Sequence, residues 1–189
     1  MKFCNQCGAP GHYIIPPGDN RDRFVCKNCG HIQYVNPRII AGCLPIYEDQ
    51  VLLCKRAIEP RYGLWTLPAG FMENGESTLS GALREAKEEA NLTADPQGLY
   101  TVFSLPHISQ VYMFYRVHML DLNFSAGEES LDDRLYEETE IPWDQLSFHV
   151  INQTLEHYFE DRKTGVFPVH EATLDRRTDP LLRSNCSAA

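Results

Sequence analysis

Acidic side chains with regular spacing stand out at residues 85–89. Glu85, Glu88 and Glu89 occupy positions i, i+3 and i+4, which places them on one face of an α-helix. Like charges this close repel one another, so a bound cation would offset the cost. Carboxylate oxygens are hard ligands that suit Mg²⁺ or Mn²⁺ rather than zinc. The spacing therefore indicates a divalent-metal site, with a solvated acidic face as the simpler alternative.

The residues around these acids predict a helix that docks on a core and presents its carboxylates. Ser77 or Thr78 can cap the N-terminus, after a turn at Gly75. Asn91 stands where the helix should end, and asparagine is second to glycine at a left-handed C-terminal cap. Helical spacing also predicts a buried stripe formed by Leu79, Ala82, Leu83, Ala86 and Ala90.

The longer segment 70–92 resembles the Nudix box, G-x5-E-x7-R-E-U-x-E-E-x-G-U, in which U is apolar. The matching positions are Gly70, Glu76, Arg84, Glu85, Ala86, Glu88, Glu89 and Leu92. Asn91 replaces the last glycine, and we expect little damage because asparagine can adopt the same left-handed backbone. The resemblance spans about residues 38 to 160. It implies an α/β fold, the Nudix α/β/α sandwich with a mixed sheet.

The resemblance also implies roles for the residues of the box. Glu85, Glu88, Glu89 and the backbone carbonyl of Ala69 are implied to hold the catalytic Mg²⁺ or Mn²⁺. The general base is implied to be Glu88, Glu89 or an acid from a later loop. For Arg84 we favour a role in pairing with the box acids and holding them in place, with a catalytic role as the alternative.

A later segment, residues 129–136, resembles the family pattern E-x-x-E-x-R-W-F, and we expect it to form a loop. Glu129 is thereby implied as a further metal ligand, as in NADH pyrophosphatases. Asp132 takes the second acidic position with a side chain one methylene shorter, so its role stays open.

Four of the seven cysteines form a second pattern, Cys4-x2-Cys7 followed by Cys26-x2-Cys29. Gly8 and Gly30 follow the two pairs and allow turns whose amides point at the thiolates, as in tetrahedral zinc sites. Chance pairs or a redox site are the alternatives, but a redox Cys-x2-Cys usually occurs singly. We therefore expect structural zinc.

The chain divides by pattern into a zinc ribbon at 1–34, a Nudix hydrolase domain at 35–165 and a loosely ordered tail at 166–189. A segment as small as the ribbon needs a metal to hold it together. Within the domain we expect strands at 38–47, 51–56, 64–67, 98–104 and 111–119, the box helix, and a second helix at 150–163.

Composition narrows the class of partner. The formal net charge of −9 over 189 residues argues against a dedicated nucleic-acid binder. The N-terminus lacks the apolar stretch of a signal peptide, and no apolar run could span a bilayer. We expect a cytoplasmic protein without membrane contact that acts on a small nucleotide, and by family resemblance a homodimer.

The substrate class follows from resemblance alone. A ribbon before a Nudix domain resembles NADH pyrophosphatases, but residues 104–114 lack the tryptophan and two prolines of their S-Q-P-W-P-x-P-x-S motif. The layout is closer to ADP-ribose/FAD pyrophosphatases. We expect hydrolysis of ADP-ribose or FAD to AMP and a second phosphate ester. The alternatives are an NADH/NAD diphosphatase and a non-catalytic nucleotide-sensing or nucleic-acid-binding Nudix protein.

No substrate-binding residue is assigned by these patterns. Four aromatic side chains near the box could stack on a base or a flavin, although their strand spacing also suits a core: Trp65, Phe71, Tyr112 and Phe114.

Overall fold

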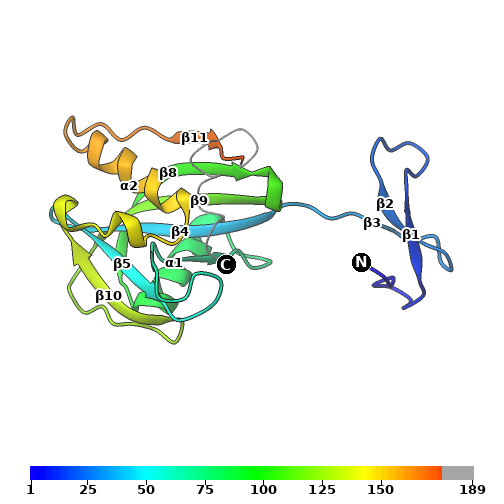
Figure 1. The fold of residues 1–189 in the computed structure, drawn as a ribbon, viewed down its shortest axis with the longest axis horizontal. Coiled ribbons are helices and arrows are strands. Elements are labelled where there is room, and N and C mark those ends of the chain that lie inside the picture. Colours follow the sequence, from blue (N-terminus) through cyan, green and yellow to red (C-terminus); the bar gives the residue numbers. More distant parts are fainter. Residues whose placement is uncertain (176–189) are drawn as a thin grey trace. The chain divides into compact units, whose positions relative to one another are not determined.

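The structure is a computed structural model that describes residues 1–175, and residues 176–189 lie outside its described part (Figure 1). The chain divides into two compact units, Met1–Pro37 and Arg38–Ala189. Each unit has a sheet and a core of its own. No helix in the described part of the chain has the length and apolar character needed to cross a membrane.

The first unit is a small antiparallel sheet in the order β1-β2-β3. Its strands are β1 (Gly11–Ile14), β2 (Arg23–Cys26) and β3 (Ile32–Gln33). The buried core consists of Cys4, Phe24 and Cys26, with Ala9 packed against them. Apolar burial on this scale does not hold a domain together, so the unit depends on another source of stability.

The four predicted cysteines supply a geometry that suits a metal. Their sulfur atoms all lie within 4.8 Å of one another. Gly8 and Gly30 both have left-handed backbones, at φ 71° and 70°. The turns aim backbone N–H groups at sulfur, with Gln6 donating to Cys4 Sγ and Asn28 to Cys26 Sγ, each at 3.4 Å. The amides that stabilise thiolates in zinc knuckles are therefore in place, and the cluster fits tetrahedral zinc.

The second unit is built on an eight-stranded mixed sheet in which six strands follow the order β10-β5-β4-β9-β8-β11. Strands β4 and β9 pair in parallel, as do β8 and β11, and the other pairs are antiparallel. The strands are β4 (Arg38–Tyr47), β5 (Gln50–Arg56), β6 (Trp65–Thr66), β7 (Ala69–Phe71), β8 (Ala94–Leu105), β9 (Gln110–Met119), β10 (Ser130–Tyr136) and β11 (His170–Thr173).

Two α-helices pack on this sheet, α1 (Thr78–Ala90) and α2 (His149–Asp161), and they enter separate cores. Short 3-10 helices lie at Pro106–Ile108, Glu138–Glu140 and Trp143–Gln145. On β5, Leu53 belongs to the α2 core, whereas its neighbours Leu52 and Cys54 belong to the α1 core. Since successive strand side chains point to opposite faces, the sheet lies between the helices (Figure 1). This confirms the predicted α/β/α sandwich.

Strands β4 and β5 separate soon after the turn that joins them. They pair only through Ile46 with Val51 and Tyr47 with Gln50. Beyond that point β6 pairs with β5, and β7 pairs with β4. The segment that enters the Nudix box therefore joins both strands, and it runs beside α1.

Three expectations about strands were wrong or incomplete. Residues 130–136, expected as part of a loop, form β10 on β5. The short β7 was not predicted. The expected loose tail begins at residue 166, yet His170–Thr173 forms β11 on β8.

Side-chain contacts with β8 and α2 explain why residues 170–173 form a strand instead of a loose tail. His170 Nε2 lies 2.7 Å from Asp161 Oδ2, which also accepts a 2.7 Å hydrogen bond from Tyr100. The His170 ring stacks on His157 with 3.9 Å between centroids. The polar composition of the tail does not indicate these partners, because they lie outside it.

The ends of α1 match the sequence prediction. Ser77 Oγ accepts a hydrogen bond from the Ser80 amide at 3.1 Å. Asn91 is left-handed at φ 51°, and its N–H donates to the Ala86 carbonyl. Lys87 Nζ also donates to Asn91 Oδ1 at 2.6 Å. The departure from the Nudix pattern at Asn91 is thus accommodated by the backbone that glycine would adopt.

We predict that Asn91→Ala lowers the free energy of unfolding by about 1 kcal/mol, because a left-handed backbone disfavours a Cβ. Asn91→Gly should unfold within about 0.5 kcal/mol of the wild type, since glycine accepts this conformation. Urea denaturation of the two variants measures the difference. Equal midpoints for the alanine and glycine variants would contradict a left-handed cap.

We predict that the purified protein carries one zinc ion and that Cys26→Ser loses it and exposes the first unit to protease. Metal analysis and limited proteolysis measure the two effects. Cys43→Ala, which alters a buried cysteine of the second unit, is the matched control and should retain zinc. A zinc-free protein whose first unit still resists protease would refute the assignment.

Candidate active site

A cavity of about 1350 Å³ opens in the second unit and gathers the predicted acids. Glu85, Glu88 and Glu89 reach it from α1, and Glu129 reaches it from the residue before β10. Ala69 of β7 also lines the wall. The structure therefore brings every predicted residue of the divalent-metal site to one cavity, although Glu129 is distant from α1 in sequence.

Arg84 is bonded to acids rather than directed at open space. Its Nε and Nη2 donate to the two oxygens of Glu76 at 3.1 and 2.9 Å. Its Nη1 donates to Glu85 Oε1 at 2.7 Å and to Glu88 Oε2 at 3.0 Å. Nη2 also donates to the Phe71 carbonyl at 3.1 Å. This arrangement supports the positioning role expected for Arg84, since one guanidinium ties helix α1 to strand β7.

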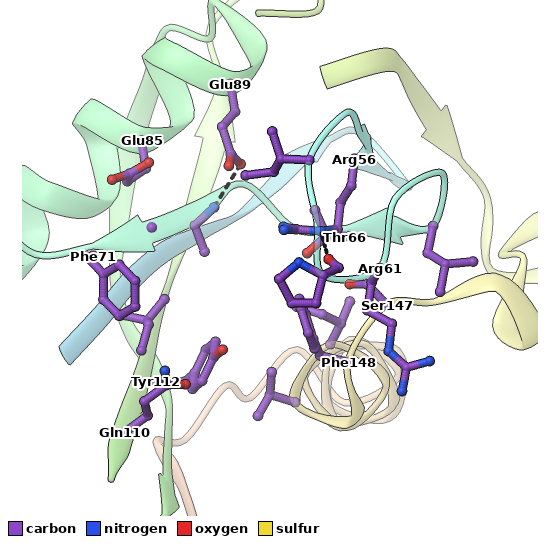
Figure 2. A pocket seen from close by; sticks show the side chains of 18 of the residues that line it. Arg56, Arg61, Thr66, Phe71, Glu85, Glu89, Gln110, Tyr112, Ser147 and Phe148 are labelled. Atoms are coloured by element: carbon purple, nitrogen blue, oxygen red, sulfur yellow. Dashed lines mark hydrogen bonds between the residues drawn. The ribbon is translucent and has the colours of Figure 1, made fainter. Parts of the chain in front are cut away.

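Glu89 is the buried acid of the cavity, with only 8% of its surface exposed. Its Oε2 accepts a hydrogen bond from the Ala69 amide at 3.0 Å, drawn as a dashed line in Figure 2. Burial raises the pKa of Glu89 to about 8, although that hydrogen bond partly opposes the shift. Burial also raises the pKa of Glu85, against the opposing effect of Arg84.

These carboxylates have the chemistry of a hard-cation site. A buried carboxylate is costly unless a cation compensates it, and oxygen donors select Mg²⁺ or Mn²⁺. Within residues 1–175, the four cysteines are the one set of three or more ligand residues whose donor atoms lie within 4.8 Å of one another. The carboxylates are more widely spaced, which suits ions that keep several water or phosphate ligands, as Mg²⁺ does.

Two glycines allow the acids to come this close. A Cβ on Gly70 would overlap the Glu85 carboxylate, and a Cβ on Gly127 would overlap the Glu88 carbonyl. The Gly127 amide donates to the Glu89 carbonyl at 2.8 Å, so the loop before β10 caps the last turn of α1. Gly70 belongs to the predicted box, whereas sequence reasoning assigned no role to Gly127.

Glu129 and Asp132, which take the two acidic positions of the family pattern in segment 129–136, have different surroundings. The Glu129 carbonyl accepts a hydrogen bond from the Ala57 amide at 2.8 Å, and its charge contributes to raising the pKa values of Glu85 and Glu89. Asp132 instead pairs with Arg134 at 2.7 Å and is not part of the cavity wall. Of this pair, the structure places only Glu129 with the box acids.

The four candidate aromatic residues also divide. Trp65 and Phe114 are buried in the α2 core. Phe71 is 48% exposed and lines the cavity with Tyr112, which is only partly buried (Figure 2). Of these four aromatic residues, only Phe71 and Tyr112 are therefore available to contact a ligand in this cavity.

The opposite side of the cavity carries residues that sequence reasoning did not identify as a site. Arg56 ends β5, and Ser147 and Phe148 lie just before α2. Figure 2 shows these three residues on one side, with Glu85, Phe71 and Tyr112 on the other. Sequence reasoning assigned no role to Arg56, Ser147 or Phe148, because they come from separate segments that meet only in the folded chain.

Comparisons with known proteins agree with this geometry. Residues 2–35 match the model of the Nudix N-terminal zinc ribbon, and residues 36–149 match that of the NUDIX domain. The crystal structure of a NUDIX hydrolase from Nitrosomonas europaea is 51% identical and superposes with a TM-score of 0.87, covering 92% of this chain and 100% of that one.

Curated relatives carry two kinds of name. The NAD-capped RNA hydrolase NudC of Salmonella heidelberg (strain SL476) is 29% identical over 65% of this chain and 51% of its own length. The ADP-ribose pyrophosphatase of Methanocaldococcus jannaschii is 27% identical over 58% of this chain and 67% of its own length. The chain thus spans about half the length of the NudC relative. With more than half of its residues matched by the NUDIX model, the chain belongs to the Nudix family.

Proposed function

We propose that this protein hydrolyses the diphosphate bond of a nucleoside diphosphate joined to a second moiety, with ADP-ribose and FAD as the leading substrates. The observation that carries the proposal is the buried Glu89, which lines a large cavity together with Glu85 and Glu129. The volume of about 1350 Å³ exceeds the usual range for drug-sized ligands and suits a dinucleotide.

The metal would be held by oxygens that line this cavity. We assign Glu85, Glu88, Glu89, Glu129 and the Ala69 carbonyl as ligands of Mg²⁺ or Mn²⁺. A bound divalent ion supplies charge neutralisation for the diphosphate and lowers the pKa of a water molecule.

Residues of the chain itself would position the metal ligands and accept a proton from the attacking water. Arg84 keeps Glu85 and Glu88 in place through its hydrogen bonds, and the Ala69 amide orients Glu89. Glu88 is 58% exposed and is bound by Arg84 through Oε2, so we favour its Oε1 as acceptor of the proton of the attacking water, with Glu89 as the alternative base.

The location of residues 104–114 supports the substrate ranking. This segment lacks the tryptophan motif of NADH pyrophosphatases, and its Leu105, His107 and Ile108 line the cavity. The missing motif therefore lies where a substrate would be contacted. NADH or NAD hydrolysis is the second candidate, favoured by the zinc ribbon and by the relatives named NAD-capped RNA hydrolase.

Substrate trials test the proposal directly. With Mg²⁺ or Mn²⁺, we expect ADP-ribose to give AMP and ribose 5-phosphate, and FAD to give AMP and FMN, with no free phosphate in either case. Mass spectrometry identifies the products, and EDTA should abolish turnover. A much higher kcat/KM for NADH would replace the ranking with the second candidate, and binding without turnover of any substrate would favour a nucleotide sensor.

We predict that Glu89→Gln lowers kcat at least about 100-fold, because it replaces a carboxyl group that can ligate a cation or accept a proton by a neutral amide of the same size. Circular dichroism should show an intact fold. Glu160→Gln, a matched change at an exposed acid, should leave kcat unchanged. Near-normal turnover by Glu89→Gln would contradict the assignment of Glu89.

A further inference from the structure

The N-terminus of α2 faces the same cavity as the carboxylates. Phe148, His149, Val150 and Asn152 all line it. The cap residue of this 13-residue helix, Phe148, makes no side-chain capping hydrogen bond. The first N–H groups of a helix carry partial positive charge and favour anions, but a helix terminus alone does not make a site.

Ser147 supplies the independent sign of a ligand. Its side chain lines the cavity directly before the helix and is only 4% exposed. Within residues 1–175 its buried Oγ has no hydrogen-bond partner. Buried hydroxyl groups are almost always paired, so this hydroxyl can donate a hydrogen bond to a ligand bound in the cavity.

Arg56 adds a full positive charge on the same side of the cavity (Figure 2). Its Nε donates to the Pro60 carbonyl at 3.0 Å, which fixes the side chain, as the dashed line in Figure 2 shows. The guanidinium carbon lies 5.3 Å from the centre of the Phe148 ring, against the start of α2. No carboxylate of the described residues forms an ion pair with Arg56 within 4.0 Å.

We propose that Arg56, the Ser147 hydroxyl and the N-terminus of α2 together bind a phosphate group of the substrate. A phosphate oxygen accepts hydrogen bonds from each of these donors, and the guanidinium balances its charge. This inference rests on the proposed function and extends it, because it gives the wall opposite Glu85 a role in holding the substrate. The phosphate is either part of the scissile diphosphate or a further phosphate ester on the nucleoside or sugar.

Titration with inorganic phosphate in EDTA tests the site without turnover. Phosphate should shift the backbone amide signals of residues 147–150 in nitrogen-15 NMR spectra. Arg56→Gln should weaken binding about tenfold, and Ser147→Ala roughly fivefold. Arg162→Gln, the same change at the opposite end of α2, should bind phosphate like the wild type. If Arg56→Gln does not fold, Ser147→Ala decides the matter.

Absence of phosphate binding by the wild type would overturn the proposal, as would unchanged binding in Ser147→Ala and in a folded Arg56→Gln. Because this titration needs no reaction, its result is independent of whether the protein is a hydrolase. Failure of all substrates to turn over would instead contradict the proposed function and leave the phosphate site standing.

Substrates that differ by one phosphate identify the source of the group. Values of kcat/KM are compared for ADP-ribose and its 2′-phosphate, in the wild type and Arg56→Gln. An equal loss on both substrates assigns the site to the diphosphate, and a loss confined to the 2′-phosphate assigns it to the additional ester. Unchanged kcat/KM on both substrates would refute a role for Arg56 in substrate binding.

Discussion

Repulsion among the carboxylates of α1 is the constraint around which this site is built, and the Arg84 guanidinium offsets it. One side chain bonds Glu76, Glu85 and Glu88 and also holds the carbonyl of Phe71. The acids are therefore fixed relative to β7 as well as to one another. Charge-assisted hydrogen bonds of this kind are strong and directional, so they keep the helix face ready for a cation.

The fold serves this cluster by bringing distant segments to the same place. The separation of β4 and β5 admits β7, whose Ala69 amide bonds the buried Glu89. The loop before β10 docks on the end of α1 through Gly127 and delivers Glu129. Across the cavity, the start of α2 offers hydrogen-bond donors, whereas the wall that carries the carboxylates offers acceptors. Such a pair of walls can hold an anion between a metal and a guanidinium.

Local sequence patterns predicted those helices and strands whose formation depends on residues within the same segment. The 38–47 strand and the box helix were found because apolar spacing and caps such as Ser77 and Asn91 lie within one segment. Strands β7, β10 and β11 were missed because their partners are far away in sequence. The box acids could be predicted from their spacing, whereas Arg56 and Ser147 gain meaning only from the cavity that they share.

We propose that the carboxylates organised by Arg84 form the divalent-metal site of this Nudix hydrolase. The most direct measurement is a Mn²⁺ titration followed by electron paramagnetic resonance, on the wild type and on Arg84→Gln. We predict that the folded variant binds Mn²⁺ at least about tenfold more weakly, because the acids lose the guanidinium that positions them. An unchanged Mn²⁺ affinity in a folded Arg84→Gln, or no Mn²⁺ binding by the wild type, would contradict it.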